Sequence, residues 1–275
     1  MTFRIGTPSP SFRHVSTAGL LACLASLLLV ASGASAQGFI EINQAVVDAN
    51  GGFPYVITAP GSYRLTGNLI KTGADGSVNA IEIDSSNVDL DLRGFFMAGP
   101  GTCTRNPSTY AVTCTGHVPG QGVLVSVGSN DVTIRSGIIK GFFNGVVSSA
   151  LGTRADSLSV NEHAFVGVQL FGDGSEVQNV SAQRNGTSGI TVQNHSHVTQ
   201  CNASQNDDYG VLANLNSSVD RSYAMGNRLG GMSLNPTATF FLNSVLDNLG
   251  TDPVFSGIDG GGNICTNAAG SAAGC

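Results

Sequence analysis

The chain has 275 residues, of which 11% are charged, about half of the usual share. It contains 37 Gly and no Trp, and its formal net charge is −6. So few charges exclude long helices with charged, solvated faces and favour short strands and frequent turns. The negative sign disfavours nucleic acid as a partner, because a phosphate backbone would be repelled.

Residues 1–36 are predicted to be a secretory signal peptide. Arg4 and Arg13 precede an apolar stretch, and Ala34-Ser35-Ala36 is a small-x-small cleavage site. The apolar stretch has about 16 residues, whereas a membrane-spanning helix needs roughly 20. A lipoprotein site at Cys23 is the alternative interpretation, although few apolar residues precede it. We therefore expect a secreted, periplasmic or cell-surface protein of bacterial type, with no membrane span after cleavage.

Two segments early in the mature chain lie outside the repeats. Residues 41–48 are predicted to form a short amphipathic helix that caps the N-terminal end of the domain, because the open end of a stack of strands would otherwise pair with another chain. Residues 99–121 contain three Pro together with Cys103 and Cys114. We interpret them as an inserted, disulfide-tied loop, with an irregular extra coil as the alternative.

From Gly122 onward, the sequence repeats with a period of 21 to 23 residues. Each repeat has a Gly followed by an apolar residue, at Gly122, Gly145, Gly167, Gly189, Gly210 and Gly231. An Asn recurs at a spacing of 21, at Asn185, Asn206, Asn227 and Asn248. Strand–helix–strand units take about 30 residues or more, so the period predicts coils of short parallel strands. Stacked Asn side chains are then expected to bond one another in a ladder.

Within the repeats, apolar residues alternate with polar ones, which is the pattern of strands with one buried face. The predicted interior columns are Val177, Val198, Val219 and Phe240, then Ala182, Ala203, Ala224 and Val245. The fold class is therefore all-β, and residues 37–255 are predicted to form one right-handed parallel β-helix, the hand following from crossover sterics. A leucine-rich repeat is the alternative, but its dense Leu pattern is absent.

Five cysteines remain after cleavage, and export permits disulfides. The pairs that close short loops are Cys103–Cys114 and Cys265–Cys275. Cys201 is then left over and falls in an apolar column, where a buried thiol packs like a small apolar side chain. Sequence alone does not fix this connectivity. Residues 256–275, rich in Gly and Ala, are predicted to form a covering tail held by the second pair.

Three stretches carry a family likeness. Residues 57–65 contain Pro60-Gly61-Ser62-Tyr63, residues 88–95 form an alternating Val-Asp-Leu-Asp-Leu strand, and residues 132–142 form a similar later coil. Together they resemble the right-handed β-helix proteins of the pectate-lyase-like superfamily. That superfamily includes polysaccharide lyases, glycoside hydrolases, uronate epimerases and phage tailspikes. The resemblance implies binding or processing of extracellular polysaccharide, with acidic polysaccharide among the candidates.

For an enzyme, the resemblance implies a charged groove along one outer sheet, but the outward positions of the Gly strands are neutral. These positions are Val147, Gln169, Thr191, Leu212 and Ser233, then Ser149, Phe171, Gln193, Asn214 and Asn235. A glycosidase needs two carboxyl groups roughly 5–9.5 Å apart, and a uronate lyase needs acidic Ca²⁺ ligands and a base. The sequence therefore leaves open whether the protein is a lyase, an epimerase, a hydrolase or no enzyme.

Charged residues gather instead in the turn before each Gly. Lys140, Glu162 and Arg184 are expected to share one column, and His163 lies in line with the Asn residues. The candidate catalytic groups are Glu162 or Asp208 as the acid and His163 as the base. The candidate residues for holding an acidic sugar are Lys140, Arg184 and Arg228. The alternative is a solvated turn in which opposite charges offset repulsion between coils.

No metal site is predicted. Asp89 and Asp91 face outward on one strand and leave Ca²⁺ open as a cofactor, but the solvated side of an early coil is the better explanation for them. His195 and His197 also share a strand face, without a further ligand fixed nearby by the sequence.

Two hypotheses follow: a β-helix that binds or processes polysaccharide, and a structural or adhesive surface module without catalysis. They differ in whether the charged turn residues converge in one groove.

Overall fold

The computed structural model describes residues 38–76, 78–267 and 275, which lie in the unit Phe39–Cys275 apart from Gly38. The predicted signal peptide, residues 1–36, falls outside the described residues. No helix within the described part of the chain is long and apolar enough to cross a membrane.

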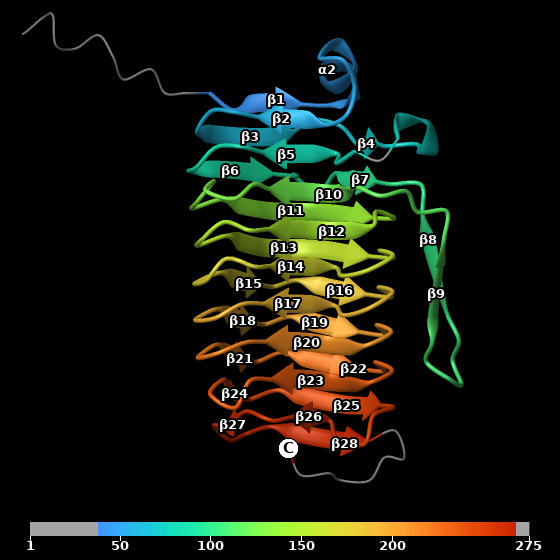
Figure 1. Cartoon of the computed structure of the whole chain (residues 1–275), viewed down its shortest axis with the longest axis vertical. Helices are drawn as coiled ribbons and strands as arrows, with labels where there is room; N and C mark the ends of the chain where they lie inside the picture. Colours follow the sequence, from blue (N-terminus) through green and yellow to red (C-terminus); the bar gives the residue numbers. More distant parts are fainter. Residues whose placement is uncertain (1–37, 77, 268–274) are drawn as a thin grey trace, which may run out of the picture. The chain divides into compact units, whose positions relative to one another are not determined.

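The described chain forms a parallel β-helix, with two long sheets whose strands alternate along the sequence (Figure 1). The nine-stranded sheet consists of β2 (Tyr55–Ile57), β5 (Ile81–Ile83), β10 (Gln121–Val125), β12 (Asn144–Ser148), β14 (Val168–Leu170), β17 (Ile190–Val192), β20 (Tyr209–Ala213), β23 (Gly230–Leu234) and β26 (Val254–Phe255). The seventeen-stranded sheet begins with β1 (Ile40–Ile42), β3 (Gly61–Leu65), β4 (Leu69–Ile70), β6 (Val88–Asp91), β7 (Phe96–Ala98), β11 (Thr133–Lys140) and β13 (Arg154–Asn161). It continues with β15 (Glu176–Gln178), β16 (Ser181–Gln183), β18 (His197–Thr199), β19 (Asn202–Ser204), β21 (Ser218–Asp220), β22 (Tyr223–Met225), β24 (Thr239–Phe241), β25 (Ser244–Asn248), β27 (Ile258–Asp259) and β28 (Ile264–Asn267).

The coils stack in the register that the repeat predicts. Val177 lies beside Val198, and Val198 beside Val219, each on the next parallel strand. Ala182 lies beside Ala203 in the same way. All of these side chains are buried in one continuous apolar core between the two sheets. These parallel strand pairings confirm the predicted parallel β-helix.

The predicted Asn ladder is present, and it is buried. Asn185, Asn206, Asn227 and Asn248 are all 0% exposed. The side-chain amide of each of the first three donates to the Oδ1 of the next Asn, at 3.0, 3.1 and 2.9 Å along the series. The backbone N–H of each of the first three also donates to the next Oδ1. The ladder thus satisfies polar groups that the turn would otherwise leave unpaired inside the protein.

Both predicted disulfides are present. Cys103 and Cys114 join β8 (Thr102–Arg105) to β9 (Val112–Thr115), an antiparallel hairpin that projects from the coils. Cys265 is bonded to Cys275. Cys201 is a free, buried thiol, as predicted, and burial raises its pKa to about 12. A thiol with such a pKa stays protonated and unreactive at neutral pH.

The two ends of the stack differ from the sequence expectation in detail. A short helix, α2 (Gln44–Ala49), lies near the first strands, and a 3₁₀ turn, η1, covers Gly73–Asp75. At the other end, β27 pairs with β24 and β28 pairs with β25. The boundary of a covering tail at residue 256 is therefore wrong, because residues 258–267 add another coil. The last coil breaks the 21-residue spacing, because Asp259 lies 19 positions after its partner Phe240.

Candidate functional site

Glu162 and Arg184 form an ion pair at the edge of the stack, with a guanidinium nitrogen 2.9 Å from a carboxylate oxygen. Lys140 does not share their column, because it pairs in register with Asn161. The turn between Lys140 and Gly145 is one residue shorter than the turn between its register partner Asn161 and Gly167. Lys140 is therefore displaced by one position from the column of Glu162 and Arg184. The predicted alignment of three charges is thus wrong for Lys140, whose ammonium lies 5.4 Å from the ring centroid of Phe96.

His163 occupies the interior and not a solvated turn. It is 0% exposed. Its Nδ1 accepts from the Phe142 N–H at 3.2 Å, and its Nε2 lies 3.1 Å from the Ile139 carbonyl oxygen. Burial lowers the pKa of His163 to about 3. The prediction that His163 is a surface base is wrong, because the ring has no access to a substrate and both nitrogens are engaged.

Asp208 and Arg228 lie further along the same edge. Arg228 is held by Asp207, at 2.9 Å, and lies 3.9 Å from Asp208. Burial raises the pKa of Asp208, and the negative charge of Asp207 raises it further. The guanidinium of Arg228 is therefore already neutralised by a neighbouring carboxylate. The candidate residues do not converge in one groove, and of them only Glu162 and Arg184 line the hollow beside the hairpin described next.

The hairpin of β8 and β9 lies along this edge, over the turns of several coils (Figure 1). Three contacts hold it there: Val112 N–H to Asp207 Oδ1 at 2.7 Å, Arg105 to the Gly226 carbonyl at 3.0 Å, and Tyr110 hydroxyl to Asp247 Oδ1 at 2.9 Å. Between hairpin and coils lies a hollow of about 450 Å³. Its lining residues are Cys103, Thr104, Arg105, Glu162, Arg184 and Gln205.

A second hollow, of about 380 Å³, lies on the outer face of the nine-stranded sheet. Its polar lining includes Thr191, Asn214, Ser233 and Asn235, from three successive coils, and Leu212 and Pro236 supply apolar surface. Thr191, Leu212 and Ser233 are register neighbours on β17, β20 and β23. The outward column predicted from the sequence is therefore a real surface column, and it lines this hollow.

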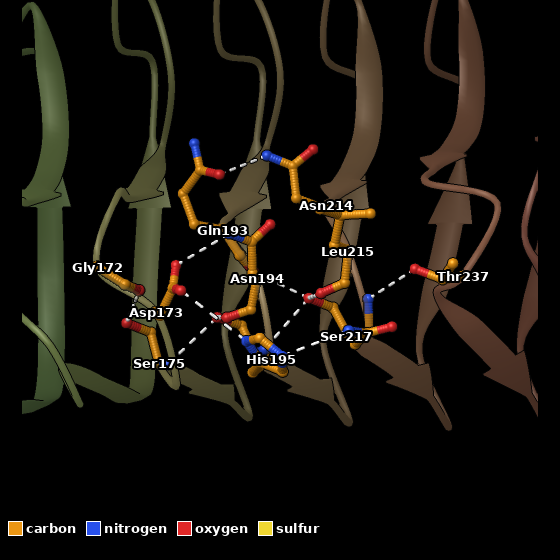
Figure 2. Close-up of polar contacts among 12 residues, drawn as sticks. Gly172, Asp173, Ser175, Gln193, Asn194, His195, Asn214, Leu215, Ser217 and Thr237 are labelled. Atoms are coloured by element: carbon orange, nitrogen blue, oxygen red, sulfur yellow. Dashed lines mark hydrogen bonds and ion pairs between the residues drawn. The ribbon is translucent and has the colours of Figure 1, made fainter.

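Polar side chains continue from this hollow into the adjoining turns (Figure 2). Asn214 donates to Gln193 Oε1 at 2.6 Å, and Asn194 donates to Asp173 Oδ1 at 3.3 Å. His195 lies 3.9 Å from Asp173. These contacts join side chains of three successive coils at the surface: Asp173 on one, Gln193, Asn194 and His195 on the next, and Asn214 on the third.

The seventeen-stranded sheet carries a charged outer face that the sequence analysis missed. Arg154, Glu176, His197 and Ser218 are successive register neighbours there. Asp220, 0% exposed, accepts from His197 Nε2 at 2.5 Å and from Arg221 at 2.6 Å. The signal was available, because these residues flank the buried column of Val177, Val198 and Val219.

The residues considered for metal binding contact other side chains. Arg135 lies 2.9 Å from both Asp89 and Asp91, so a guanidinium occupies the position expected for Ca²⁺. His195 faces Asp173, whereas His197 bonds Asp220. Among the described residues, no group of three potential metal ligands gathers.

No protein-family model matches the sequence, and no curated protein sequence matches it. Among solved structures, the enzymatically active domain of tailspike protein 2 of bacteriophage CBA120 is 14% identical, with a TM-score of 0.46 over 75% of this chain. This chain spans 40% of that domain. The mannuronan C-5 epimerase A-module of Azotobacter vinelandii is 12% identical, with a TM-score of 0.38, over 74% of this chain and 72% of that one.

Proposed function

We propose that the protein is an exported β-helix that binds extracellular polysaccharide on the outer face of its nine-stranded sheet. The observation that carries the proposal is the hollow lined by Thr191, Asn214, Ser233 and Asn235. Hydroxyl and amide groups both donate and accept hydrogen bonds, as sugar hydroxyls do. Their repetition at the strand spacing of roughly 4.8 Å suits a ligand that is itself a repeating chain.

Apolar contacts complete the proposed binding surface. Leu212 and Pro236 lie in the hollow beside the amides, and apolar patches between polar groups accommodate the C–H faces of sugar rings. The amide positions are already fixed, since Asn214 is bonded to Gln193. A preorganised surface loses less entropy when it binds.

The test is an Asn214→Ala/Asn235→Ala double variant, measured by calorimetry against a panel of neutral and acidic polysaccharides. Each lost hydrogen bond contributes roughly 0.5–1.5 kcal/mol, so we expect affinity for the bound polysaccharide to fall about tenfold. Asn202→Ala, on the other sheet, is the matched control and is expected to bind normally. Equal binding by the double variant and the wild type would contradict the proposal, as would no binding by the wild type to any polysaccharide.

A second candidate function, polysaccharide processing, rests on His197 and Asp220. The carboxylate fixes the Nε2 side of the imidazole. This arrangement leaves Nδ1 as the nitrogen available for proton transfer. If the protein processes its ligand, His197→Ala is expected to lower the rate by 10²-fold or more, and Asp220→Asn to lower it less. Absorbance of unsaturated uronates and new reducing ends are the readouts, and full activity of His197→Ala would remove this candidate.

We also propose that the coils wind in the right-handed sense, which crossover sterics favour, and that α2 covers the first coil. Val47 on α2 is buried in the same core cluster as the first strands, which supports the capping role. Two disulfides are typical of proteins in an oxidising compartment and support export.

A further inference from the structure

We infer that the hollow between the hairpin and the coils is a binding site for a singly charged oxyanion, carried by a ligand as a carboxylate or a sulfate ester. It is distinct from the proposed polysaccharide surface, with which it shares no lining residue. The lining holds two guanidinium groups, Arg105 and Arg184, and one carboxylate, Glu162. Their sum is one positive charge, in a chain whose formal net charge is −6.

Both arginines have unused hydrogen-bonding capacity. The Nε atoms of Arg105 and Arg184 are buried, and neither has a hydrogen-bond partner among the described residues. A buried donor without a partner costs free energy, and native structures rarely keep one without reason. Two guanidinium groups that line one hollow favour an acceptor-rich group, and an oxyanion offers only acceptors.

The structure holds Arg105 in place before any ligand arrives. Its guanidinium lies 4.0 Å from the ring centroid of Tyr110 and donates to the Gly226 carbonyl. Gly226 has a φ of 67°, and a Cβ there would lie 3.2 Å from the Arg105 guanidinium. The residues in line with Gly226 on the preceding coils, Gln205 and Arg184, have side chains and similar positive φ values of 61° and 52°. The glycine thus admits the arginine where a larger residue would displace it.

Charge balance decides the class of anion. Arg184 already gives one hydrogen bond to Glu162, so the site supplies one net positive charge and not two. A singly charged carboxylate or sulfate ester would be neutralised, whereas a phosphate, at about −1.5 to −2, would add net negative charge beside Glu162. The hollow is open at the surface of the turns, so the anionic group can belong to a larger molecule.

The experiment measures binding of sodium acetate, free galacturonate, methyl sulfate and inorganic phosphate to the full chain by ligand-observed NMR and calorimetry. We expect galacturonate and methyl sulfate to bind and phosphate to bind at least tenfold more weakly. Acetate separates the carboxylate from the rest of the sugar: equal binding of acetate and galacturonate assigns the anion alone as the ligand. Affinity is expected to fall as NaCl is raised.

Arg105→Gln and Arg184→Gln are each expected to weaken binding at least tenfold, because each removes a charge-assisted donor. Arg154→Gln is the matched control: its side chain is 40% exposed, against 42% for Arg184, and it also pairs with carboxylates. Arg105→Lys, which keeps the charge and the docked hairpin but not the planar fork, is expected to recover part of the affinity. Wild-type affinity in Arg105→Gln, an equal loss in Arg154→Gln, or no binding of any probe would overturn the inference.

The Asn214→Ala/Asn235→Ala variant is expected to bind these anions normally, so failure of one site is distinguishable from failure of the other.

Discussion

Replacing Asn206 by Ala is expected to lower the free energy of unfolding by about 3 kcal/mol, because it leaves buried polar groups unpaired in two coils. Asn206 Oδ1 accepts from the backbone N–H and the side-chain amide of Asn185. Its own amide donates to Asn227 and to the Ala182 carbonyl. Asn206 is 0% exposed, so bulk solvent does not replace these bonds. In thermal unfolding, we expect a midpoint roughly 10 °C lower.

Asn206→Asp separates hydrogen bonding from size. It keeps both acceptor positions and the shape, but it loses the donor amide and places a carboxylate beside the Ala182 carbonyl oxygen. We therefore expect it to destabilise the protein at least as much as Asn206→Ala at neutral pH. Asn214→Ala at the surface is the control and is expected to change stability by less than about 0.5 kcal/mol. If Asn206→Ala matched that control, the ladder would not be a source of stability.

The repeat predicted the ladder and the core because both depend on one spacing. A residue in an interior column meets its own equivalents on the neighbouring coils, so Val177, Val198 and Val219 reveal their contacts by recurring every 21 residues. The same rule also applied to the outward positions. Glu176, His197 and Asp220 each lie next to one of those valines in the sequence, so their shared outer face follows from the same spacing.

The hairpin site was not predictable by that rule. Arg105 meets Gly226 across 121 residues of sequence, and no periodic pattern connects them. The inserted loop departs from the repeat, so only its disulfide could be anticipated, not the edge on which it lies. The sequence also did not show which turn residues are buried. His163 was correctly aligned with Asn185, but alignment alone did not show that this column lies inside the protein and that Glu162, one residue earlier, lies outside.

Acid is expected to destabilise the protein through His163. The ring imitates an Asn side chain of the ladder: Nδ1 accepts from the Phe142 N–H as an amide oxygen would, and Nε2 donates to the Ile139 carbonyl as an amide nitrogen would. These two bonds require the neutral ring with its proton on Nε2. Burial of the ring lowers the pKa of His163 to about 3, while the unfolded chain keeps a value near 6.5.

The sign follows from which state binds the proton. Between about pH 6.5 and pH 3, the unfolded state takes up a proton that the folded state refuses, so the stability from this group is complete above pH 6.5 and is lost as the pH falls. The slope is about 1.4 kcal/mol per pH unit, and the total loss near pH 3 is on the order of 4 kcal/mol. Urea unfolding between pH 8 and pH 3 measures it.

His163→Asn is the decisive variant, because Asn is the residue that later coils carry at this position, in Asn185 and Asn206. An amide does not titrate in this range, so we expect the variant to keep its stability in acid better than the wild type, by a margin that grows as the pH falls below 6.5. His195→Asn removes a histidine whose side chain is 62% exposed, and its acid profile is expected to follow that of the wild type. Parallel profiles for the wild type and His163→Asn would show that the buried ring accepts a proton without unfolding, against the geometry of its two hydrogen bonds.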